Sequence, residues 1–240
     1  MNRNSLVRVA TTILLLQGAA CLVQAQDAAQ TYPAMAAVEK YLMDRDAEIA
    51  LARSAAPAAI SQDAEVLVLE RDGYRKASEG KNGFTCVVER SWMSPMGSPE
   101  FWNFKMRGPV CYNPQASRSI LPYTIERTRL ALKGLSKSQI ADSMKAALDK
   151  NQIPLPEAGA MSYMLSKGGY LGDGVGHWHP HLMFHIANAS AASWGANVEG
   201  SPVLLNDQFP QGPEPETIFF VPVGHWSDGT PAEASETHRH

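Results

Sequence analysis

Runs of β-branched, aliphatic and aromatic residues, bounded by turn-forming residues, predict six strands along the chain. The first three follow one another through short polar turns such as Asp72-Gly73, so we expect them to form a three-stranded meander. The predicted strands span residues 65–71, 74–77, 84–90, 160–165, 180–187 and 217–226.

Apolar residues at helical spacing predict three helices between these strands. Pro33 suits the first turn of one helix, and Asn113 and Ser136 suit the N-caps of the other two. The predicted helices span residues 33–53, 114–133 (with a break at Pro122) and 137–151. Because the strands occur in groups with helices between the groups, we expect an α+β fold. It would have a mainly antiparallel sheet with helices packed on one face, plus an N-terminal helix.

The first 25 residues have the pattern of a secretory signal peptide. Arg3 and Arg8 form a short basic start, and residues 6–16 supply an apolar stretch that is too short to span a membrane. Val23-Gln24-Ala25 then fits a cleavage site, so we expect a periplasmic or secreted chain that begins at Gln26. The alternative, a lipid anchor at Cys21, lacks the leucine that such sites usually carry three residues upstream.

The length of the mature chain predicts one folded domain with extensions. We expect a signal peptide at 1–25, an N-terminal helical segment at 26–60, a single α+β domain at 61–226 and a polar flexible tail at 227–240.

Charge and hydropathy narrow the range of partners. Without the two arginines of the signal peptide, the 21 basic residues become 19, against 24 acidic residues, which gives a formal charge of −5. With no basic cluster in the sequence, nucleic acid is not an expected partner. We also expect no transmembrane segment in the mature chain, which leaves a small-molecule ligand as the candidate partner.

The mature chain keeps two of the three cysteines, Cys86 and Cys111. In an exported protein two such thiols usually form a disulfide, and this one would close a loop of about 25 residues worth roughly 3 kcal/mol. A redox or copper-binding thiol pair is the alternative, but a Cys-x-x-Cys spacing is absent.

Four of the seven histidines lie within nine positions, all at odd numbers: His177, His179, His181 and His185. Side chains alternate between the two faces of a strand, so an extended segment would place the four imidazoles on one face. The other face would then be the core face, formed by Trp178, Leu182, Phe184 and Ile186. Clustered neutral imidazoles are typical ligands of transition metals.

The expected metal ligands are His179 and His181 together with His225 from the last strand, and His177 as a fourth. His185 lies too far along the strand to join them unless the strand bulges. Three imidazoles with one open position are typical of a catalytic centre for Zn, Cu, Fe or Mn. The sequence therefore favours an exported metal-dependent hydrolase or oxidase, in which Asp173 or His177 serves as a fourth ligand or a base.

Three alternatives remain open at this point. The histidines could simply hydrogen-bond to backbone and water at a strand end. The Met-x-x-Met pairs Met93/Met96 and Met161/Met164 could mark a copper-handling protein, although methionine also fills core gaps. Finally, the aromatic residues of the irregular stretch 91–112, which include Trp92 and Trp102, could form the ligand surface of a non-enzymatic envelope protein.

Overall fold

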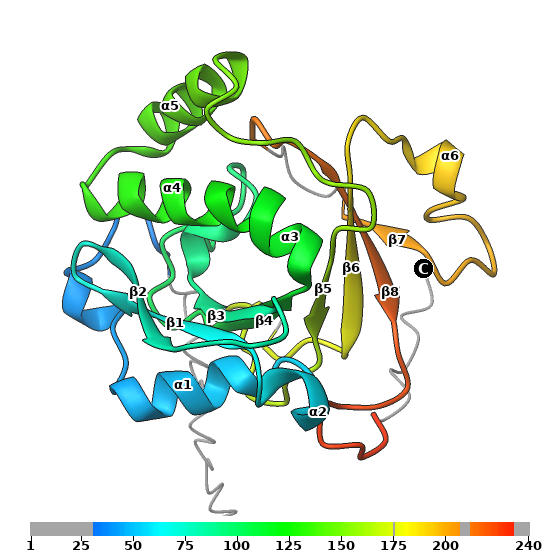
Figure 1. The fold of residues 1–240 in the computed structure, drawn as a ribbon. Helices are drawn as coiled ribbons and strands as arrows, with labels where there is room; N and C mark the ends of the chain where they lie inside the picture. The colour runs from blue at the N-terminus through cyan, green and yellow to red at the C-terminus, as the bar shows by residue number, and fades with distance from the viewer. Residues whose placement is uncertain (1–30, 175, 207–211, 233–240) are drawn as a thin grey trace, which may run out of the picture. The chain divides into compact units, whose positions relative to one another are not determined.

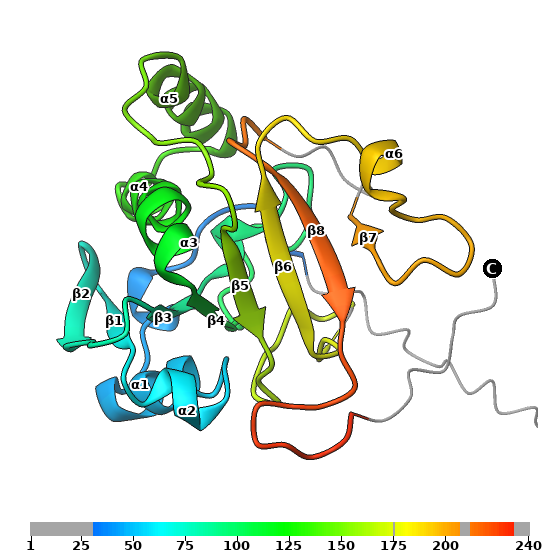
Figure 2. The ribbon, with the colours of Figure 1, turned by 45° about the vertical axis from the view of Figure 1, so that its right-hand side comes forward.

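A computed structural model describes residues 31–174, 176–206 and 212–232. The predicted signal peptide, the lipid-anchor alternative at Cys21 and the end of the predicted tail lie outside these residues. The described part contains six α-helices and one eight-stranded mixed sheet with the strand order β2-β1-β3-β4-β5-β6-β8-β7 (Figures 1 and 2). This arrangement confirms the α+β class.

Most of the elements begin and end close to the predicted positions. The strands are β1 Glu65–Glu70, β2 Gly73–Ser78, β3 Thr85–Glu89, β4 Gly108–Tyr112, β5 Met161–Met164, β6 His181–Ile186, β7 Leu204–Leu205 and β8 Thr217–Pro222. The helices are α1 Arg45–Arg53, α2 Ala58–Ser61, α3 Pro114–Ser119, α4 Leu121–Leu132, α5 Lys137–Asp149 and α6 Ala191–Trp194, with short 3-10 turns η1 Val38–Lys40 and η2 Ser91–Met93.

The predicted meander of the first three strands is wrong. β1 and β2 form an antiparallel hairpin, but β3 lies on the other side of β1 and runs parallel to it, with Val66 opposite Cys86. The cause is a close backbone crossing at Gly80, where an added Cβ would lie 2.2 Å from the Glu65 amide nitrogen. Because glycine lets the chain pass the start of β1 here, the chain reaches the far side of the hairpin. The remaining strand pairs are antiparallel.

Helices cover both faces of the sheet, not one face as predicted. α1 and α2 pack on the face that carries Val66 and Cys86, whereas α3 and α4 pack on the face that carries Val87 and Val110 (Figure 1). The reason is visible in the burial of the strands: β3 and β4 are buried on both sides, so each side needs a covering layer.

Capping residues decide where the helices begin. The predicted helix over 33–53 starts only at Arg45, because the Asp44 side chain accepts hydrogen bonds from the backbone nitrogens of Asp46 and Ala47. Ser136 forms a full capping box with Gln139 at the start of α5, as its sequence position indicated. The break near Pro122 is also present, since α3 and α4 meet at Ile120.

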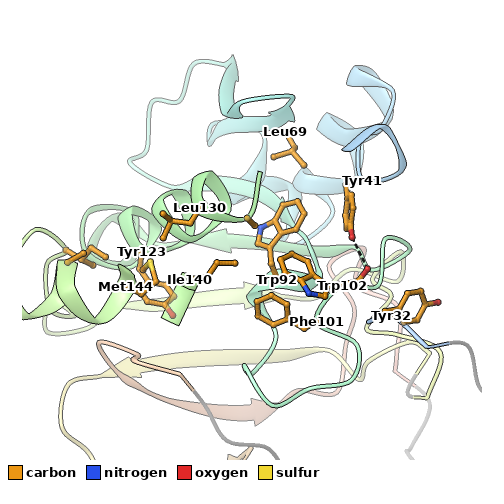
Figure 3. Close-up of a cluster of buried hydrophobic side chains, with 13 residues drawn as sticks. Tyr32, Tyr41, Leu69, Trp92, Phe101, Trp102, Tyr123, Leu130, Ile140 and Met144 are labelled. Atoms are coloured by element: carbon orange, nitrogen blue, oxygen red, sulfur yellow. Dashed lines mark hydrogen bonds between the residues drawn. The ribbon is translucent and has the colours of Figure 1, made fainter. Parts of the chain in front are cut away.

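Aromatic residues from η2 and from the stretch between η2 and β4 form part of the hydrophobic core (Figure 3). Trp92 and Phe101 are fully buried, and Trp102 is 4% exposed. Trp92 donates from Nε1 to Thr128 Oγ1 at 3.0 Å, and Tyr41 donates its hydroxyl to the Trp102 carbonyl at 2.8 Å. Met93 and Met96 pack against this cluster. Trp92 and Trp102 therefore do not provide the exposed ligand surface of the third alternative.

The predicted disulfide is confirmed between Cys86 and Cys111, whose Cα atoms lie 4.0 Å apart. The two residues are direct partners across β3 and β4, and both are fully buried. Cys111 thus belongs to a strand, although its surroundings were predicted to be irregular. In the described ranges, the helices are all too short or too polar to cross a membrane. The disulfide fits an exported protein.

Candidate functional site

The histidine segment, defined as residues 177–185, is extended only in part. β6 begins at His181, and it lies beside β8 as predicted. The assignment of its faces was inverted, because Met183 and His185 on the odd-numbered face are buried, whereas Leu182, Phe184 and Ile186 are only partly buried. The odd-numbered face is the one that carries Tyr112 and Ser162 from the neighbouring strands and packs towards α3 and α4.

Two imidazoles of the segment are fixed by backbone carbonyls. His177 Nδ1 lies 2.7 Å from the Gly169 carbonyl oxygen, and His181 Nδ1 lies 2.7 Å from the His179 carbonyl oxygen. A carbonyl oxygen only accepts, so Nδ1 carries the proton in both rings and Nε2 of the neutral ring keeps its lone pair. Burial lowers the pKa of His181, which favours this neutral form.

His225 does not belong to the last strand, where it was predicted to lie. β8 ends at Pro222, and His225 lies beyond it in an exposed turn, where it pairs with Pro231. Among the residues that the structure describes, no three His, Cys, Asp or Glu side chains are close enough together to hold a metal ion.

The predicted carboxylate Asp173 and the neighbouring Asp228 are engaged by other partners. Asp173 accepts hydrogen bonds from the hydroxyls of Tyr170 and Tyr32 and from Lys105 Nζ at 3.0 Å. These bonds lower the pKa of Asp173 to about 2, so this carboxylate is a weak base. The same bonds tie the glycine-rich residues 168–174 to Tyr32 and Lys105. Asp228 binds Lys167 Nζ at 2.7 Å, which secures the turn after β8 to the end of β5.

Glycine positions the start of the histidine segment. An added Cβ on Gly169 would lie 2.4 Å from the Trp178 ring, so only glycine lets this indole pack where it does. The Trp178 indole also donates from Nε1 to the Ser166 carbonyl at 3.1 Å. These two contacts hold the backbone on which His177 and His179 are mounted.

A buried polar network that was not predicted from the sequence lies on the face of the sheet that packs towards α3 and α4. Its members are Glu89, Tyr112, Thr124, Ser162, His185 and Glu216. His185 Nε2 lies 3.0 Å from Ser162 Oγ, and His185 Nδ1 lies 3.4 Å from Glu216 Oε1. The His185 and Glu216 side chains are each 2% exposed.

The second half of the network lies between the sheet and α4. The Glu89 carboxylate accepts hydrogen bonds from the Tyr112 hydroxyl and, at 3.2 Å, from Thr124 Oγ1. The Tyr112 ring centroid is 6.3 Å from that of His185. Burial raises the pKa of both Glu89 and Glu216, and His185 partly opposes this effect in each case. In the register of β6 and β8, His185 lies opposite Ile218. Glu216 is two residues before Ile218, so it lies on the same face of the sheet as His185. Knowledge of this register would have revealed the network.

The order serine, histidine, carboxylate is that of a nucleophile, its base and the residue that orients the base. Ser162 is 0% exposed, however, so its hydroxyl meets no substrate in this structure. The three residues therefore do not form an open catalytic centre.

Comparisons of the chain with protein-family models, with curated proteins and with solved structures find no match.

Proposed function

We propose that this is an exported metal-binding protein that holds a divalent transition metal through the imidazoles of residues 177–181. The observation that carries the proposal is the pair of 2.7 Å contacts from Nδ1 of His177 and His181 to backbone carbonyls. Metal-binding histidines commonly donate their second nitrogen in this way, because the bond orients the ring and leaves Nε2 available to the ion.

The surroundings of the segment support this role. His181 is held neutral by burial, and a neutral imidazole is the form that binds metal. His177 is exposed and His179 is partly exposed, so both rings are accessible to an ion from solvent. Zn, Cu, Fe and Mn all accept imidazole ligands, and with three imidazoles and an open position the expected activity is that of a hydrolase or an oxidase.

Metal titration of the purified, untagged mature chain tests the proposal. We expect about one Zn, Cu, Fe or Mn ion per chain, and we expect a His179→Ala/His181→Ala variant to lose it. A matched control is His238→Ala/His240→Ala, which removes the other closely spaced histidine pair in the sequence and should bind normally. A single His225→Ala variant tests whether the residues after β8 contribute a ligand.

Two results would contradict the proposal. One is binding well below one ion per chain for all four metals, and the other is loss of binding only in the His238/His240 variant. Either result would favour the non-enzymatic envelope protein, whose ligand surface would have to exclude the buried Trp92 and Trp102.

A further inference from the structure

His185 and Glu216 form a buried pair of titratable groups that the metal hypothesis does not use. Nδ1 of His185 and Oε1 of Glu216 are 3.4 Å apart, and both side chains are 2% exposed. Within the part of the chain that the structure describes, His185 Nδ1 and Glu216 Oε2 nevertheless have no hydrogen-bond partner. Buried polar atoms nearly always have a hydrogen-bond partner. Because these two atoms lack one, the interaction between His185 and Glu216 depends on which group carries a proton as well as on packing.

Each element around the pair contributes a group that bears on its charge. β3 contributes Glu89, β4 contributes Tyr112 and β5 contributes the Ser162 hydroxyl. From α4, Arg127 reaches Glu214 with 2.8 Å between Nη1 and Oε1.

Arg127 pairs directly with Glu214, and it lowers the pKa of Glu89 and of Glu216 less than His185 does. Two enclosed carboxyl groups, Glu89 and Glu216, therefore remain without a direct partner of opposite fixed charge such as Arg127 gives Glu214. Full ionisation of both carboxyl groups would place net negative charge in the interior even if His185 were protonated. An uncompensated interior charge is costly, so the folded state favours forms that keep at least one carboxyl proton.

We propose that Glu216 and Glu89, beside His185, form a buried proton-binding centre, which makes the attachment of residues 214–216 to β6 and α4 dependent on pH. The bound protons belong to the two carboxyl groups. In the protonated state, the centre is close to neutral and the 214–216 segment remains docked. In the deprotonated state, like charges accumulate behind α4 and weaken this docking.

The sign of the pH effect follows from proton uptake on folding. Burial raises the pKa of Glu216 and of Glu89, so the folded chain binds protons that the unfolded chain has already released. Stability from this centre is fully present below the pKa of an unfolded glutamate, about 4.3, and is lost as the pH rises through the higher folded values. Between the unfolded and the folded pKa, each extra proton that the folded chain holds changes the folding equilibrium constant by about tenfold per pH unit.

Urea unfolding of the mature chain between pH 5 and pH 8 tests the proposal. We expect the folding equilibrium constant of the wild type to decrease as the pH rises. Glu216→Gln keeps the shape of the side chain but cannot ionise, so this variant should show a clearly shallower decrease and a higher relative stability at pH 8. Glu89→Gln should act in the same direction. Glu157→Gln is the matched control, because this exposed acid pairs with Arg118 outside the network and should leave the slope unchanged.

Infrared spectroscopy of the folded protein gives a readout that does not depend on unfolding. We expect a protonated carboxyl band that persists above the pH at which an exposed glutamate ionises, weakens as the pH rises further, and loses intensity in Glu216→Gln or Glu89→Gln. Hydrogen exchange should show faster opening of residues 217–222 at pH 8, after correction for the intrinsic rate. A flat stability profile in the wild type, or an unchanged slope in both glutamine variants, would overturn the proposal. So would the absence of a carboxyl band, even if one variant failed to fold.

Discussion

Arg90 Nη2 lies 2.8 Å from Glu48 Oε1, and both side chains are enclosed by the protein. The same carboxylate oxygen accepts a hydrogen bond from the Leu69 backbone nitrogen, while Arg90 Nε donates to the Tyr41 carbonyl. β1 and β3 are paired only at their first residues, so the ion pair supplies partners where the two strands separate. α1 is thereby joined to the sheet through a charge and not only through apolar packing.

This geometry predicts a large loss of stability for Glu48→Gln. The substitution leaves the buried Arg90 charge without a counter-charge, which typically costs about 3–5 kcal/mol. Equilibrium urea unfolding measures the loss. In contrast, Glu39→Gln in the exposed pair with Arg71 should have no measurable effect. A double variant, Glu48→Gln/Arg90→Met, should recover part of the loss, because it removes the unpaired charge; equal losses in the single and double variants would contradict this account.

The Cys86–Cys111 disulfide should contribute about 3 kcal/mol, since it closes a loop of 25 residues in the unfolded chain. We expect the Cys86→Ala/Cys111→Ala variant and the reduced wild type to show similar decreases in unfolding free energy. If strong reducing conditions left the stability of the wild type unchanged, the bond would not have this role.

The acid limb of the stability profile should depend on Asp173. Its pKa is lowered to about 2, first by Tyr170 and then by Tyr32 and Lys105. A lowered pKa in the folded state gives stability that is present above the unfolded value, near 3.9, and is lost as the pH falls from about 4 to about 2. Asp173→Asn should therefore lower the melting temperature at pH 5 and flatten the decrease below pH 4. The prediction is wrong if the variant and the wild type follow parallel curves.

Gly169→Ala should disturb the histidine segment. The added methyl group would lie 2.4 Å from the Trp178 ring, and such overpacking usually costs 1–3 kcal/mol. The matched control is Gly174→Ala in the same loop, where an added Cβ has no atom within 4 Å. The indole NMR signal of Trp178 should shift in the first variant and remain in place in the second. Equal behaviour of the two variants would show that the close contact does not position the segment.

Local sequence signals predicted most of the elements, because each of them depends on a few neighbouring residues. The Ser136 cap fixed the start of α5, and Pro122 indicated the break between α3 and α4. β4 was missed because Gly108 and Pro109, its first two residues, are typical of loops. The parallel pairing of β1 and β3 depends on the tight crossing at Gly80, which no local pattern reveals.

The candidate site shows the same limit more clearly. Alternation placed His181 and His185 on one face of β6, and this was correct, but it could not tell which face was buried. The burial of each face depends on what packs against it. Here α6 packs on the even-numbered face of β6, where the ring centroid of Trp194 lies 6.1 Å from that of Phe184. The contacts of His185 with Ser162 and Glu216 need the register of three strands, so they become visible only in the folded chain.

The two open ends of the described sheet are both protected against strand addition. β7, at one end, has only two residues, and β2, at the other end, presents Arg75 and Lys76 to solvent. Short or charged outer strands offer a poor template for another chain to extend the sheet. Both ends therefore reduce the tendency of folded molecules to aggregate through edge-to-edge pairing.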